Sequence, residues 1–105
     1  MTAHLLVLYP HPKNIDAFVR AYREEHLPYA GPRLAGAGAT GVATRRVVGP
    51  SFAPPPYALM SDISFPTLEA LQKCAASAGG KEALAHAASI SSGGSPTIVV
   101  TVDEA

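Results

Sequence analysis

The segment HLLVLYPHP, residues 4–12, carries the clearest indication of the fold. It is a short run rich in leucine and valine, and it ends at two prolines, whose rings remove a backbone hydrogen-bond donor. This pattern predicts a buried strand. Its apolar side chains lie on both faces, as Leu5 and Val7 alternate with Leu6 and Leu8. A half-solvated sheet alternates apolar with polar residues, so we expect both faces of this sheet to be covered.

The segment after the prolines predicts an amphipathic helix. Asn14 or Asp16 can cap it, and apolar or aromatic side chains then recur at a spacing of three and four residues, ending with Tyr22 and His26. Pro28 disfavours helical torsions at the residue before it. We therefore expect the helix to end near His26, or to restart beyond it as a short turn.

The rest of the chain alternates extended and helical patterns. We predict strands at 41–48 and 57–65, a helix capped by Thr67 and stopped by Gly79 and Gly80, a short alanine-rich helix at 81–88 and a final strand at 97–102. The main elements then follow the order strand, helix, strand, strand, helix, strand. With right-handed crossovers, this order predicts an α+β, ferredoxin-like sandwich: a four-stranded antiparallel sheet with both helices on one face.

That architecture leaves the other face of the sheet bare. The first strand carries apolar side chains on this face too, and the last strand, TIVVTV, is equally apolar. The face should therefore meet another protein surface, and a symmetric homodimer supplies one most simply.

Length and charge restrict the class of protein. A chain of 105 residues predicts one domain, 1–105, which buries about 60 to 70% of its unfolded surface. Eight basic residues balance eight acidic ones without clustering, which argues against nucleic acid as a partner. The apolar runs are too short to cross a membrane, and one cysteine fits a reducing compartment. We expect a soluble cytoplasmic protein.

Two motifs are set aside. GAGATG, residues 36–41, has the letters of a dinucleotide-binding loop, but a helical pattern precedes it and a strand pattern follows, the reverse of what such a loop requires. The four histidines form no pair at metal-ligand spacing, and Cys74 has no second ligand nearby. We therefore predict neither a bound cofactor nor a metal.

His26 is the strongest candidate for chemistry. An imidazole on an apolar stripe needs a partner, and a position at a helix carboxyl end favours its protonated form. Either it hydrogen-bonds locally and braces the turn before Pro28, or it lines a cavity and exchanges a proton with a ligand near neutral pH. Tyr22, one turn earlier, could line the same pocket. Asp62 is a candidate third member, with a rim or interface position as the alternative.

These residues also carry a resemblance to a known family. The matching segments are LYP at 8–10, the spacing F-x-x-x-Y-x-x-x-H-x-P from Phe18 to Pro28, FPTLEAL at 65–71 and SP before the last strand. The chain resembles the EthD family, named for ethyl tert-butyl ether degradation. The resemblance implies a dimeric α+β barrel in which two sheets pack face to face, a place in oxidative catabolism, His26 as the motif histidine and Tyr22 as its aromatic neighbour.

The chain departs from the family pattern in the segment before the last strand. Members often carry an aspartate there, where this chain has His86 and Ala87. Two functions follow. In the first, a homodimer acts on a small organic acid or carbonyl compound without a bound cofactor, with His26 as general acid/base or hydrogen-bond donor and Tyr22 and Asp62 contacting the substrate. In the second, the protein is a non-catalytic carrier or an accessory to an oxygenase.

Overall fold

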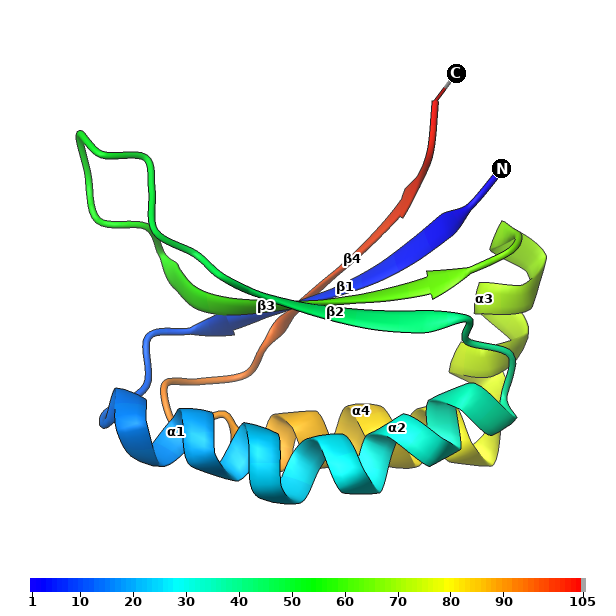
Figure 1. Ribbon diagram of the computed structural model, residues 1–105, viewed down its shortest axis with the longest axis horizontal. Helices are drawn as coiled ribbons and strands as arrows, with labels where there is room; N and C mark the ends of the chain where they lie inside the picture. The colour runs from blue at the N-terminus through cyan, green and yellow to red at the C-terminus, as the bar shows by residue number, and fades with distance from the viewer. Residues whose placement is uncertain (105) are drawn as a thin grey trace.

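The computed structural model describes residues 1–104 and shows a four-stranded antiparallel sheet covered by helices on one face (Figure 1). The strands are β1 (Ala3–Pro10), β2 (Gly41–Arg46), β3 (Tyr57–Phe65) and β4 (Thr97–Val102), in the spatial order β2-β3-β1-β4. β1 pairs antiparallel with both β3 and β4, and β2 pairs antiparallel with β3. The predicted ferredoxin-like architecture is confirmed.

The first helical segment is longer than the sequence predicts. α1 (Ile15–Ala21) runs into a π-helical turn, η1 (Tyr22–His26), and then into α2 (Leu27–Gly36). The helix therefore does not end near His26. The backbone N–H of Leu27 donates to the carbonyl of Tyr22, five residues back, and this wider turn lets α2 start afresh. Pro28 then lies in the first turn of α2, where its missing N–H costs little.

The pair Gly79 and Gly80 does not end the second helical segment, although the sequence predicts that it does. α3 (Leu68–Ala76) is capped by Thr67 as predicted and ends before Ser77, whose side chain accepts a hydrogen bond from Gly80 N–H and so begins α4 (Ala78–Ile90). A Cβ built on Gly80 would lie 1.9 Å from the carbonyl oxygen of Cys74. Both glycines lie in the first turn of α4, and the close approach of α3 leaves no room for a side chain at Gly80.

The hydrophobic core lies between the sheet and the helices. Side chains of β1 alternate between buried and half-buried, and the buried set packs against Phe18, Tyr22 and the inner faces of α2, α3 and α4. The other face of the sheet carries no helix in Figure 1. Leu6, Leu8 and Met60 are half-buried there, and Val99 is exposed. The prediction of a second, apolar and uncovered sheet face is confirmed for the single chain.

The GAGATG segment connects a helix to a strand. Gly36 is the last residue of α2, Gly38 adopts a positive φ of 109° in the turn, and Gly41 begins β2. The segment does not open a helix, in agreement with the prediction that it is not a dinucleotide-binding loop.

Candidate functional site

Tyr22 is anchored to the sheet by its hydroxyl group. It lies in η1 with 2% of its surface exposed. Its hydroxyl oxygen is 2.5 Å from Oγ of Ser61 on β3 and 2.8 Å from Oγ1 of Thr44 on β2. Three hydroxyl groups thus form a chain from the buried side of the sheet to its exposed edge strand. Such a chain fixes the ring of Tyr22 and satisfies its polar end.

His26 lies one turn beyond Tyr22 and is 6% exposed. The centroids of the two rings are 5.5 Å apart. Its Nδ1 is 2.9 Å from Nδ1 of His86 on α4, so one of the two nitrogens donates a proton to the other. His26 therefore does not brace the turn before Pro28 by a local hydrogen bond. The contact between His26 and His86 connects η1 to α4.

The protonation of His26 also differs from the sequence prediction. Burial, the larger cause, and the neighbouring charge of His86 together lower the pKa of His26 from 6.5 to about 4. The sequence places His26 at a helix carboxyl end, which favours the charged form, but the helix continues through α2. Desolvation therefore decides the charge, and His26 is neutral at pH 7.

His86 is the residue that sequence reasoning did not assign to the site. It is half-buried, and its ring stacks on that of Tyr29 at 4.5 Å between centroids. The guanidinium of Arg33 lies 3.6 Å from the centroid of Tyr29 on the ring face and donates to Glu82 at 3.2 Å. The one available signal was the sequence resemblance to the EthD family, which implies an aspartate at about the position of His86 and Ala87. Here a second imidazole fills the position.

A small cavity lies between the helices and the sheet beside these residues. Its volume is about 20 Å³, room for roughly one water molecule. Three of its lining side chains are polar, those of Tyr22, His26 and Ser61. The rest are glycine or apolar, including Leu27 and Leu84. An apolar chamber with a few converging polar groups is the usual form of a small-molecule site, although this one holds no organic molecule without side-chain movement.

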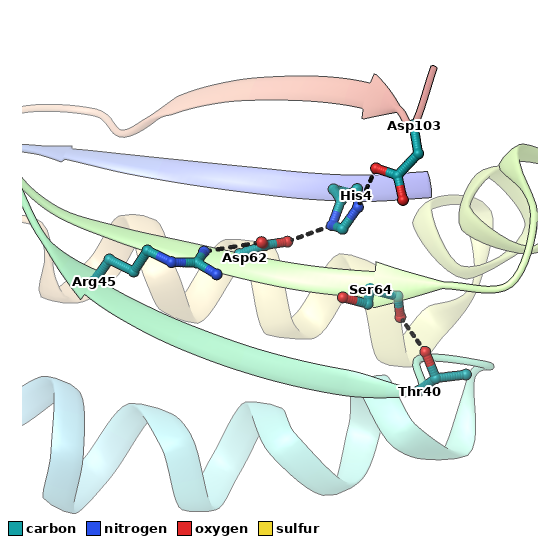
Figure 2. A network of polar contacts seen from close by, with 6 residues as sticks. All are labelled: His4, Thr40, Arg45, Asp62, Ser64 and Asp103. Atoms are coloured by element: carbon teal, nitrogen blue, oxygen red, sulfur yellow. Dashed lines mark hydrogen bonds and ion pairs between the residues drawn. The ribbon is translucent and has the colours of Figure 1, made fainter. Parts of the chain in front are cut away.

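Asp62 does not join Tyr22 and His26. Successive side chains of a strand point to opposite faces, and since Ser61 faces the helices, Asp62 faces the open side of the sheet. Figure 2 shows Asp62 between Arg45 and His4: its Oδ2 accepts from Arg45 at 2.9 Å and its Oδ1 accepts from His4 Nδ1 at 2.8 Å. The other alternative, a position on a prospective interface, matches this geometry.

His4 completes this network on the open face of the sheet. Its Nε2 donates to Asp103 at 2.9 Å, so both ring nitrogens face carboxylates. The hydrogen bond to Asp62 raises the pKa of His4 above its usual 6.5, with Asp103 adding to the effect against desolvation. The pKa of Asp62 is lowered, since the bonds from Arg45 and His4 outweigh desolvation. In a separate contact between β3 and the residue before β2, Thr40 Oγ1 donates to the Ser64 carbonyl (Figure 2).

Two further observations concern metals and membranes. Among residues 1–104, no three His, Cys, Asp or Glu side chains are grouped as a metal site would need. Within the same part of the chain, no helix combines the length and apolar character needed to cross a bilayer.

The structure is similar to solved structures over nearly its whole length. An EthD family protein from Bacillus halodurans matches 99% of this chain and 100% of its own, with a TM-score of 0.82 and 23% sequence identity. An EthD-like protein from Ralstonia eutropha matches with a TM-score of 0.68 and 20% identity, covering 95% of this chain and 89% of its own. The chain has the fold of the EthD structures. The predicted resemblance to the EthD family is confirmed for the fold.

A third similar structure is described as a dimeric ferredoxin-like protein of unknown function. It comes from Jannaschia, is 18% identical, has a TM-score of 0.63 and covers 97% of this chain and 98% of its own. No protein-family model matches the sequence. No curated protein matches it either.

Proposed function

We propose that this chain is an EthD-like cytosolic homodimer that acts in catabolism on a small, mostly apolar organic acid or carbonyl compound without a bound cofactor. The observation that carries the proposal is the convergence of Tyr22, Ser61 and His26 on one otherwise apolar cavity. Leu27 and Leu84 are half-buried, so their movement can enlarge the cavity for a ligand. Tyr22 would orient that ligand through its hydroxyl group.

His26 would act through its uncharged form. With a pKa of about 4, His26 is an inefficient general base at pH 7, because efficient general bases have a pKa near the working pH. If His86 donates across the 2.9 Å contact, neutral His26 carries its own proton on Nε2. That N–H is then a hydrogen-bond donor for a ligand oxygen, comparable to donors that stabilise developing negative charge on a carbonyl oxygen.

The proposed dimer forms through the open faces of two sheets. The open face exposes Val99 and leaves Leu6 and Leu8 half-buried in a single chain. Similar structures are described as dimeric, which supports a dimer here.

The activity is tested with a thermal-shift screen against aromatic acids and ketones, followed by product analysis. We expect a ligand to raise the melting temperature and a product to accumulate. His26→Gln should retain the thermal shift and lose product formation by about a hundredfold or more. His11→Gln, a histidine outside the cavity, is the matched control. Turnover unchanged in His26→Gln would show that the role given to His26 is wrong.

The depressed pKa of His26 also favours a second function, that of a non-catalytic carrier or accessory protein. A neutral imidazole in an apolar chamber binds a carbonyl or carboxyl oxygen without transferring a proton. A ligand that raises the melting temperature and is recovered unchanged would support this function over the enzymatic one.

A further inference from the structure

We infer that an open groove beside Tyr22 is a binding site for a compact monocarboxylate, whose charged group lies between Arg23 and Arg46. The inference rests on the proposed function, because it names the class of ligand that would bind at a groove adjoining the cavity beside His26. It selects organic acids over neutral carbonyl compounds.

The groove is large enough for such a ligand, whereas the cavity is not. Its volume is about 320 Å³, at the lower end of small-molecule sites and adequate for a single-ring compound. The groove lies between the first helical segment and β2. Tyr22 and Leu27 line both this groove and the cavity beside His26. A ligand in the groove is therefore separated from the cavity by the same two side chains.

The charge at the groove fits an anion. Arg23 on η1 and Arg46 on β2 both line it, and neither guanidinium has a carboxylate within 4 Å among the described residues. The adjoining depression adds Arg20 but also two acids, Asp16 and Glu24, which leaves an excess of positive charge. Guanidinium groups bind carboxylates with two parallel hydrogen bonds, so two unpaired arginines select for this group.

The remaining walls fit an apolar body with one polar end. Val19 and Leu59 supply apolar surface. Thr44 lines the groove and is 2.8 Å from the Tyr22 hydroxyl, which in turn contacts Ser61 in the cavity. The hydroxyl chain can thus receive a polar substituent of the ligand at its outer end.

The test compares benzoate with benzamide, its neutral counterpart, by calorimetric titration of the full-length chain. We expect benzoate to bind and benzamide to bind at least tenfold more weakly. Arg46→Gln and Arg23→Gln should each weaken benzoate binding by about tenfold, the loss of one charge-assisted hydrogen bond. Arg46→Lys, which keeps the charge and loses the planar fork, should fall between wild type and Arg46→Gln. Lys73→Gln on α3, with the same change in charge away from the groove, should bind as wild type.

Other outcomes overturn the inference and identify what fails. Equal binding of benzamide and benzoate, unchanged in the arginine variants, would remove the carboxylate site and leave the proposed action on carbonyl compounds standing. Sulfate competing as well as benzoate would reduce the groove to non-selective anion attraction. If benzoate binds as expected while His26→Gln changes no turnover, the site stands and the catalytic role of His26 fails.

Discussion

The two histidine pairings show how neighbours shift the pKa of the same side chain in opposite directions in one small protein. His26 faces another imidazole in the core and its pKa is lowered, whereas His4 faces two carboxylates on the open sheet face and its pKa is raised. Each shift leads to a prediction.

Replacing His86 by Phe should raise the pKa of His26 above about 4, because the nearby positive charge is removed. The pKa should remain below 6.5, since burial is the larger cause and an aromatic ring keeps His26 buried. NMR titration of the His26 ring protons measures the change. His11→Phe is the control and should leave the pKa of His26 unaltered; a pKa of His26 unmoved by His86→Phe would contradict the coupling.

Replacing His4 by Asn should alter the pH dependence of the unfolding free energy. A histidine whose pKa is higher in the folded state adds to the unfolding free energy. This contribution is complete at pH values below the unfolded pKa of 6.5 and is lost as the pH rises through the raised pKa of the folded state. The difference in stability between wild type and His4→Asn should therefore shrink from pH 6 to pH 8. Urea unfolding at several pH values measures it, with His11→Asn as control. A difference that grows with pH would contradict the assigned pairing.

At the scale of elements, the π-helical turn and the close helix contact resolve two local conflicts in the sequence. In the interior of a continuous α-helix Pro28 would remove a backbone hydrogen bond, and the turn at η1 lets a new helix begin one residue before it. The same turn contains both Tyr22 and His26. The pair Gly79 and Gly80 looks like a helix terminator, but Gly80 permits the close contact between α3 and α4, and Gly79 lies against the backbone of Arg33 on α2.

Gly80→Ala should destabilise the protein strongly. The new Cβ would meet the Cys74 carbonyl at 1.9 Å, a backbone atom that cannot rotate away, so we expect a loss of about 2 kcal/mol or more. Gly31→Ala in α2 is the matched control. Its Cβ would have no atom within 4 Å, and the change should stabilise by about 0.5–1 kcal/mol. Chemical denaturation of both variants checks the difference, and equal effects would contradict the close helix contact.

At the scale of the whole molecule, the sheet is covered on one face only. The helices lie on one side (Figure 1). The open side carries the apolar side chains of Leu6, Leu8 and Val99. It also carries the polar network of His4, Arg45, Asp62 and Asp103 (Figure 2). Since this network is paired within one chain, a second copy can cover it without leaving an unpaired buried charge.

Leu8→Lys should therefore convert the proposed dimer to a monomer, because it places an unpaired charge in the centre of the open face. Sedimentation should report twice the chain mass of 10.8 kDa for wild type and the mass of a single chain for the variant. Leu68→Lys changes an exposed leucine on α3, away from that face, and should remain dimeric. A wild-type monomer at micromolar concentration would overturn the pairing.

Periodicity and turn chemistry alone predicted the order of the main elements, the antiparallel sheet, the cap at Thr67 and a cap at Asn14 or Asp16, of which the structure has Asn14. These features depend on residues close together in the chain. The partners were decided only by tertiary structure: His86 lies 60 residues from His26, and the face of the sheet to which Asp62 points follows from strand register. Burial, and with it the neutral state of His26, also arises from segments far apart in the sequence, which local patterns do not encode.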